Sequence, residues 1–125
     1  MENETIARAM FDAFQAGDIA AAGELLADDF AGVQNGGPAM PRDALLGFLA
    51  TVHAKVSDFR YEDIVCEATA TGFVEEHTVR ATLTDGSPFA MKLCVVGTVA
   101  NGKVTQLREY LDTAQAAGLA AALAA

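Results

Sequence analysis

The sequence has few basic residues and no long hydrophobic run. Lys and Arg number 8 against 17 Asp and Glu, which gives a formal net charge of −9. Binding to DNA or RNA needs a basic surface that replaces counterions, and these cations are not clustered along the chain. The apolar stretch at residues 91–100 is interrupted by Lys92 and is too short to span a bilayer. We therefore expect neither nucleic acid nor a membrane as partner.

Cysteine and histidine are also scarce, with two of each. Cys66 and Cys94 lie in apolar stretches typical of strands, where a free thiol behaves as a small hydrophobic group. His53 and His77 fall on separate predicted elements and lack the spacing of metal ligands. The sequence therefore predicts no disulfide, no metal and no cofactor.

The amino-terminal residues are acidic and lack the basic and apolar regions of a secretory signal, so we expect a cytoplasmic protein. A chain of 125 residues with 52% hydrophobic residues is large enough for one core. No linker or repeat divides it, which predicts a single domain over residues 1–125.

Helical periodicity dominates the first half of the chain. Residues 4–16 predict a helix that ends at Gly17, and Asp18 is placed to cap the next helix. A third helix is expected over residues 42–54, after Pro41. Asp112 could cap a final Ala-rich helix, which we interpret as a packing element.

From residue 57 onward the apolar pattern has a period of two. Strands are expected around residues 59–66, 72–83, 89–99 and 104–111, and a short extended piece at 30–35. Asp85-Gly86 and Asn101-Gly102 are typical of hairpin turns. The order predicts an α+β fold in which one layer of helices packs on an antiparallel sheet.

Five segments carry a resemblance to a known superfamily. They are FQAGDIAA at 14–21, LLADDF at 25–30, VQN at 33–35, PRDA at 41–44 and NGKVTQLREYLD at 101–112. In this order they resemble the nuclear transport factor 2-like superfamily, in its SnoaL-like and ketosteroid-isomerase-like branch. The resemblance implies a cystatin-like cone, in which a curved antiparallel sheet is wrapped by amino-terminal helices around an apolar pocket. It also implies a homodimer formed through the convex face of the sheet.

Two known catalytic sets of this superfamily are incomplete here. A ketosteroid isomerase would have Asp at Asn35, Tyr near Met10 and Asp near Val95. A limonene-type epoxide hydrolase would match Asn35, and it would have Asp where Glu109 stands, but its remaining site positions differ. Val33 stands where that enzyme has Tyr, and Glu76 and Thr78 where it has Arg and Asp. The chain is therefore predicted to be neither enzyme in its standard form.

The resemblance further implies which strand residues face the pocket. Three strands contribute alternating positions, namely Glu76, Thr78 and Arg80; Met91, Leu93 and Val95; and Leu107, Glu109 and Leu111. The expected ligand-binding positions are completed by Met10, Phe14, Val33 and Asn35. From the residues alone, the polar face that holds Glu76, Thr78 and Arg80 could instead point to water.

Glu109 is the strongest candidate for catalysis, with Arg80 and Glu76 as the residues that tune it. Leu107 and Leu111 lie on its face of the strand, so its carboxylate would lose solvation. Pairing with Arg80 would keep Glu109 ionised as a base. Without that pair its pKa should rise and it would act as an acid.

The opposite strand face predicts the dimer. His77 is expected there, as an interface or surface residue, and so are the apolar side chains Val79, Ala81, Cys94 and Val96. Exposed apolar patches of this kind usually mark an interface.

Two functions remain open. The first is a cofactor-independent acid–base enzyme of isomerase, cyclase or hydrolase type that acts on a small apolar molecule. The second is a non-catalytic ligand-binding or accessory module with the same fold. The loss of the known catalytic sets favours the binding module, and an inward acid with polar neighbours favours the enzyme.

Overall fold

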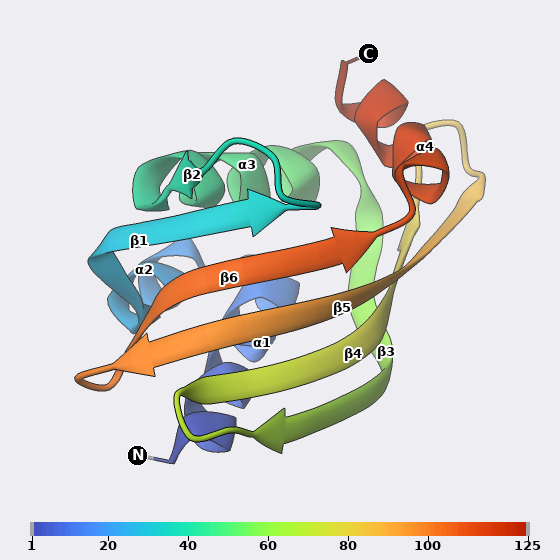
Figure 1. The fold of residues 1–125 in the computed structure, drawn as a ribbon. Helices are drawn as coiled ribbons and strands as arrows, with labels where there is room; N and C mark the ends of the chain where they lie inside the picture. Colours follow the sequence, from blue (N-terminus) through green and yellow to red (C-terminus); the bar gives the residue numbers. More distant parts are fainter. Residues whose placement is uncertain (1, 125) are drawn as a thin grey trace.

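The computed structural model describes residues 2–124. In chain order the elements are α1 (Asn3–Ala16), α2 (Ile19–Leu25), β1 (Leu26–Gln34), β2 (Met40–Pro41), α3 (Arg42–Lys55), β3 (Ser57–Ala68), β4 (Gly72–Thr82), β5 (Pro88–Ala100), β6 (Lys103–Leu111) and α4 (Thr113–Ala124). The strands form one sheet in the order β2-β1-β6-β5-β4-β3, which curves around the helices (Figure 1). This arrangement confirms the predicted α+β cone.

The sheet is mixed rather than antiparallel throughout. β1 pairs with β6 in parallel, whereas β3, β4, β5 and β6 form an antiparallel meander. Between β1 and β6 the chain forms α3 and strands β3, β4 and β5. This long connection allows β1 and β6 to pair in parallel. β2 contains two residues and was not predicted from the sequence.

Local signals at the element ends are confirmed. Gly17 follows α1 in the left-handed region, at φ 70°, and the Asp18 side chain accepts a hydrogen bond from the Ala21 amide at 3.1 Å. Asp112 accepts one from the Ala114 amide at 2.8 Å at the start of α4. Asn101 and its following glycine have φ values of 54° and 76°, as a tight hairpin turn requires.

The core lies between α1 and the concave face of the sheet. Met10 of α1 and Val95 of β5 are fully buried there, as is Phe73 of β4. Phe73 lies opposite Gly97 in the β4–β5 ladder. A Cβ atom on Gly97 would stand only 2.2 Å from the Phe73 ring, so this close approach requires glycine.

The convex face is more polar than predicted. Val79 and Ala81 point to the concave side and are buried, so their assignment to an outer apolar patch is wrong. Cys94 keeps its predicted place on the convex face, in one row with the exposed side chains of Val65 and Tyr110. The apolar surface that could support a dimer is therefore smaller than expected.

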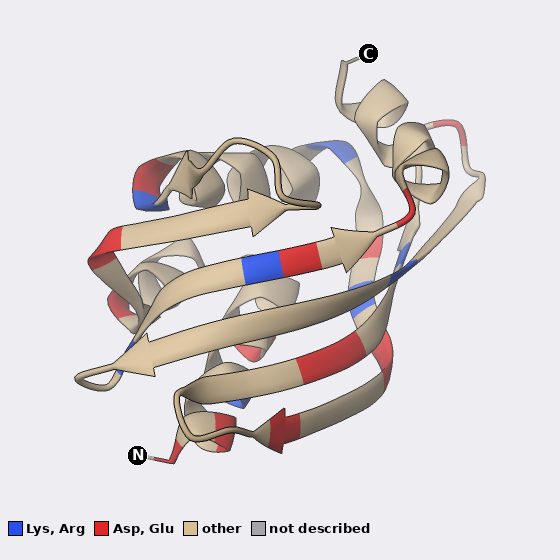
Figure 2. Ribbon diagram, viewed as in Figure 1, with Lys and Arg blue, Asp and Glu red and all other residues tan. Residues whose placement is uncertain are grey.

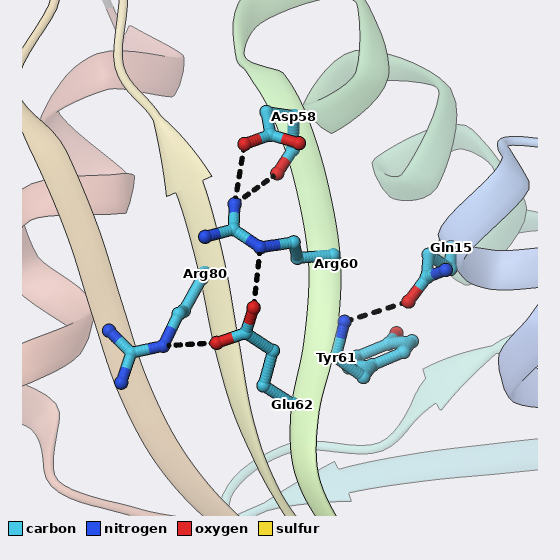
Figure 3. Close-up of polar contacts among 6 residues, drawn as sticks. All are labelled: Gln15, Asp58, Arg60, Tyr61, Glu62 and Arg80. Carbon is cyan, nitrogen blue, oxygen red and sulfur yellow. Dashed lines mark hydrogen bonds and ion pairs between the residues drawn. The ribbon is translucent and has the colours of Figure 1, made fainter.

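An ion-pair network covers part of the same face. Arg80 of β4 lies 2.8 Å from Glu62 of β3, and Glu62 also accepts a hydrogen bond from Arg60 at 2.8 Å (Figure 3). Arg60 reaches the Asp58 carboxylate at 2.6 Å. The Arg80 and Glu62 side chains are about two-fifths exposed, at 40% and 42%, so the pair contributes little to stability.

Of the helices within residues 2–124, none has the length and apolar content that a membrane crossing requires.

Dimerisation through the convex face stays a prediction. Tyr110 is 49% exposed at the β6 end of the row that also holds Cys94 and Val65, so Tyr110→Lys should weaken a dimer that uses this face. Light scattering at micromolar concentration should report a dimer for the natural sequence and a shift toward monomer for the variant. A natural chain that is monomeric in this assay would contradict the prediction.

Alanine substitutions at Gly97 and Gly47 should have opposite effects on stability, because only Gly97 is in close contact with another side chain. Gly97→Ala should lower the free energy of unfolding by about 1–3 kcal/mol, because the new methyl group overlaps the Phe73 ring. Gly47→Ala lies in α3 with no atom near its new Cβ, and it should raise that free energy by about 0.5–1 kcal/mol. Urea denaturation of both variants measures the difference; equal effects would contradict the packing argument.

Candidate functional site

A cavity of about 540 Å³ lies between the concave face of the sheet and helices α1, α3 and α4. Its walls are mostly apolar, with Phe11 and Phe14 from α1 and Leu119 from α4 among them. The small residues of α4 border the cavity, so this Ala-rich helix closes one side of it as well as packing on the fold. Such a site suits a small and largely apolar ligand.

The polar side chains that line the cavity come from four strands and one helix. They are Gln34 of β1, Thr51 of α3, Tyr61 of β3, His77 of β4 and Glu109 of β6. The lining contains neither Lys nor Arg. The cavity therefore has no fixed cation to bind an anionic ligand or to neutralise an acid.

Strand register aligns these groups in rows across the sheet. Glu75 of β4 pairs with Val95, Val95 with Glu109 of β6, and Glu109 with Gln34 of β1. Directly paired residues share one face, so both carboxylates point to the concave side. Their backbones are separated by two strand spacings, roughly 10 Å. His77 stands one row away, on the same face as Glu75.

Glu75 holds the imidazole of His77 in place. The His77 Nδ1 atom lies 2.6 Å from Glu75 Oε2, and both side chains are almost fully buried. A carboxylate only accepts hydrogen bonds, so Nδ1 carries the proton and donates it. The rings of Phe11 and Tyr61 pack on the imidazole, with centroids at 5.1 and 4.4 Å. His77 therefore has a fixed orientation and leaves Nε2 available to the cavity.

Glu109 has a raised pKa. Its carboxyl group is surrounded by the apolar walls, and this burial raises its pKa above the ordinary value of 4.5. A hydrogen bond with the Gln34 side chain, and the charge of His77 whenever that ring is protonated, act in the opposite direction but do not cancel the rise. At a given pH more of this group is protonated than in an exposed glutamate, which suits a proton donor.

Tyr61 and Cys66 border the same acidic groups. Burial raises the pKa of the Tyr61 phenol well above 10, and the charges of Glu109 and Glu75 add to the rise. Burial also raises the pKa of the Cys66 thiol to about 11, with Glu75 again adding to the effect. Tyr61 therefore stays a phenol that can donate a hydrogen bond, and Cys66 stays an unreactive thiol.

The predicted orientation of β4 is wrong. Met91 and Leu93 line the cavity as expected, but their partners across the ladder are Val79 and His77. Glu76 and Arg80 therefore lie on the convex face, where Glu76 is exposed and Arg80 pairs with Glu62.

Thr78 shares that convex face and is buried there, between β3 and β5. None of the three predicted β4 residues lines the cavity. With Arg80 outside, no guanidinium offsets the burial that raises the pKa of Glu109.

The prediction for β1 is displaced by one residue. Asn35 follows β1 at φ 50° and uses its side chain to bond the backbone of Leu111, with its amide donating to the carbonyl and its oxygen accepting from the amide, both at 3.0 Å. It ties β1 to the end of β6 and does not line the large cavity. Gln34 takes the inward place beside Glu109.

Some of the other predicted ligand-binding residues line a cavity, and the rest pack in the hydrophobic core. Phe14 lines the cavity, as do Met91 and Leu93. Leu107 and Val33 border a smaller cavity under β1. Three residues contribute to the packing instead, with Met10 and Val95 in the core and Leu111 packed against it.

Sequence reasoning placed His77 on the outer face and did not select Glu75, Tyr61 or Gln34. The register of this pair depends on the loop between β4 and β5. A two-residue turn at Asp85-Gly86 would place His77 opposite Cys94, on the outer face. The loop has three residues instead, closed by a 2.9 Å hydrogen bond from the Leu83 amide to the Ser87 carbonyl, and this shift of one residue places His77 opposite Leu93.

Charge and donor chemistry restrict what the site can hold. No group of three His, Cys, Asp or Glu within residues 2–124 is arranged to hold a metal ion. Lys and Arg are dispersed over the ribbon in the view of Figure 2. The groups available for chemistry are the Glu75–His77 pair, Glu109, Gln34 and Tyr61.

The fold and cavity define a class of small α+β cones with an acidic, apolar-walled interior. Residues 7–107 match the SnoaL-like domain family, and the chain belongs to that family. It therefore lies in the nuclear transport factor 2-like superfamily, as the sequence resemblance implied. No curated protein sequence matches the chain.

Solved structures of similar fold come from several organisms. A candidate polyketide cyclase from Pseudomonas putida superposes with a TM-score of 0.81 at 21% identity, covering 92% of this chain and 95% of the other. A second, from Xanthomonas campestris, has a TM-score of 0.78 at 25% identity, with 89% and 90% covered. An epoxide hydrolase of the LEH-like type from M. tuberculosis has a TM-score of 0.76 at 20% identity, with 98% and 92% covered.

The raised pKa of Glu109 predicts a pH-dependent stability difference. Burial makes Glu109 harder to ionise in the folded state than in the unfolded state. The folded protein therefore loses stability as pH rises from the unfolded-state pKa of this group through its folded-state pKa. Glu109→Gln removes this loss. Its free energy of unfolding relative to the natural sequence should therefore increase from pH 4 to pH 8, as measured by urea denaturation.

Glu76→Gln is the matched control, because it changes an exposed carboxylate on the convex face. Its difference from the natural sequence should stay constant over the same pH range. A Glu109→Gln difference that shrinks with rising pH would show that the carboxylate is stabilised in its ionised form.

Proposed function

We propose that this protein is a cofactor-independent acid–base enzyme, of isomerase, cyclase or hydrolase type, that acts on a small and mostly apolar molecule in the cavity. The observation that carries the proposal is that a candidate proton acceptor, His77, and a candidate proton donor, Glu109, line the same apolar cavity. Glu75 orients His77 at 2.6 Å, and Glu109 faces the same cavity with a raised pKa. An oriented imidazole and a carboxyl group of raised pKa that face one cavity are suited to accept and donate a proton.

The roles follow from the proton positions. In the neutral His77 ring, Nδ1 donates to Glu75 and Nε2 has the lone pair that can accept a proton from a carbon beside a carbonyl group. The protonated carboxyl of Glu109 donates to the carbonyl oxygen as negative charge develops there. The electron pair of the broken C–H bond forms the C=C bond of an enol, and the carbonyl π electrons bind the new O–H proton. The proton held by His77 then goes to a different carbon of the conjugated system while the O–H proton returns to Glu109, which re-forms the carbonyl group and completes an isomerisation.

Two further groups assist this chemistry. Tyr61 lines the cavity as a phenol and can donate a hydrogen bond to the same developing charge. Gln34 hydrogen-bonds the Glu109 carboxyl group and so holds its orientation in the cavity. Their roles are positioning and stabilisation rather than proton transfer.

The comparisons support this range of reactions. The Xanthomonas and Pseudomonas proteins are candidate polyketide cyclases, and the M. tuberculosis protein is an epoxide hydrolase. Cyclisation, isomerisation and epoxide opening all need a proton donor and a proton acceptor in one site. The Glu109 and His77 arrangement supplies both types of group.

A ligand-binding module with the same fold is the second candidate. The cavity alone favours it, because about 540 Å³ of mostly apolar space would hold a small molecule without any chemistry. The two functions differ in whether Glu109 and His77 affect turnover or only affinity.

Proton exchange tests the enzyme proposal without a known substrate. Cyclohex-2-enone and cyclohexanone are incubated with the protein in D₂O, and the loss of α-proton signal is followed by NMR. The natural sequence should accelerate exchange over buffer. Glu109→Gln and His77→Gln should each lower this rate by at least about a hundredfold, the usual contribution of a general acid or base.

Glu76→Gln is the control for catalysis, since its carboxylate lies on the convex face, and it should exchange at the natural rate. Acceleration that survives both site variants would exclude the assigned roles. If the protein binds a ketone but no ketone or apolar epoxide is turned over, the binding module is the correct function.

A further inference from the structure

A second cavity meets the first at Glu109. It has a volume of about 290 Å³ and lies under β1 and the segment that leads to β2. Four residues border both cavities, namely Gln34, Leu45, Phe48 and Glu109. Two of these come from α3 and two from the sheet, so they form the boundary between a large chamber and a small one.

The polar groups are distributed unevenly. Apart from Gln34 and Glu109, every side chain or glycine that borders the small chamber is apolar, and these include Phe30, Gly32 and Leu107. The large chamber adds His77 and Tyr61. The proton-donating groups thus stand at the junction and on its large-chamber side, and the small chamber has nothing that reacts.

The small chamber is large enough for a substantial apolar group. A cavity of about 150 Å³ holds benzene, so about 290 Å³ accepts a branched alkyl group or a bicyclic ring. Neither chamber is lined by Lys or Arg, so a carboxylate or phosphate would lose its solvation without a partner.

Resting on the proposed function, we infer that the substrate is an elongated, uncharged molecule whose reacting oxygen lies in its interior. One apolar arm occupies the small chamber, the oxygen meets Glu109 and Gln34 at the junction, and the remainder fills the large chamber beside His77. A compound with its oxygen at one end would leave one chamber empty or move the oxygen away from Glu109.

Two isomeric ketones test this arrangement. Nonan-5-one and nonan-2-one have the same atoms and differ only in whether the carbonyl lies in the middle of the chain. Affinity is measured by displacement of N-phenyl-1-naphthylamine, an uncharged fluorescent probe. We expect nonan-5-one to bind about tenfold more tightly, the equivalent of roughly two additional buried methylene groups.

Filling the small chamber should remove this preference. Gly32 borders only that chamber, and a Cβ on it would have its nearest neighbour at 3.4 Å, so Gly32→Leu can place its side chain there. The variant should bind nonan-5-one about tenfold more weakly and should keep its affinity for cyclohexanone, which fits the large chamber alone. Ala120→Leu borders only the large chamber and should weaken cyclohexanone binding instead.

The outcomes separate this inference from the proposed function. Equal affinities of the natural sequence for the two ketones, or a preference for nonan-2-one, would overturn the inference even if proton exchange is catalysed. The comparison uses the natural sequence, so it holds even if a variant does not fold. Tighter binding of nonan-5-one without any proton exchange would support the two-chamber ligand and reject the enzyme. Tighter binding of nonanoate than of either ketone would overturn the requirement for an uncharged molecule.

Discussion

The β4–β5–β6 register is the constraint on which the site depends. In this ladder Glu75, Val95 and Glu109 occupy one row, and His77 follows Glu75 on the same face. A shift of one residue in any of these strands would turn its inward side chains to the convex face. Because the sheet curves around α1, the inward groups converge on one space, and the same register supplies both the core and the acid–base groups.

The register also explains why burial of charge is tolerated. A buried histidine and glutamate each lose solvation, and the 2.6 Å hydrogen bond between them recovers part of that cost. Glu109 has no such partner, and its burial outweighs the effects of His77 and Gln34. The cost of burial is therefore offset at the Glu75–His77 pair and only partly offset at Glu109, which is consistent with the role of proton donor that we propose for Glu109.

The sequence was sufficient for the fold but not for the orientation of one strand. The helices, their caps and the hairpin turns depend on local residues such as Asp18, Gly17 and Asn101, so local rules predicted them. On β6 the prediction that Glu109 faces inward followed from two leucines on its face. β4 carries polar residues on both faces, with Glu75 and His77 inside and Glu76 outside, so alternation alone could not decide.

Gln34 lies beside Glu109 at the position that had been predicted for Asn35. The family resemblance pointed to Asn35, but its backbone at φ 50° has already left the strand, and its side chain is used by the Leu111 backbone. Only the pairing of β1 with β6, two segments far apart in the chain, brings Gln34 beside Glu109. Long-range pairings of this kind are set by the whole sheet, and no local pattern encodes them.

The position of Arg80 finally determines what kind of chemistry the cavity can support. On the concave face this guanidinium would have neutralised Glu109 and kept it a base. On the convex face it pairs with Glu62, and no Lys or Arg borders the cavity in its place. The ionisable groups that remain on the inside are Glu75, Tyr61, His77 and Glu109. A cavity without a fixed cation fits the uncharged substrate that we infer and the proton transfer that we propose.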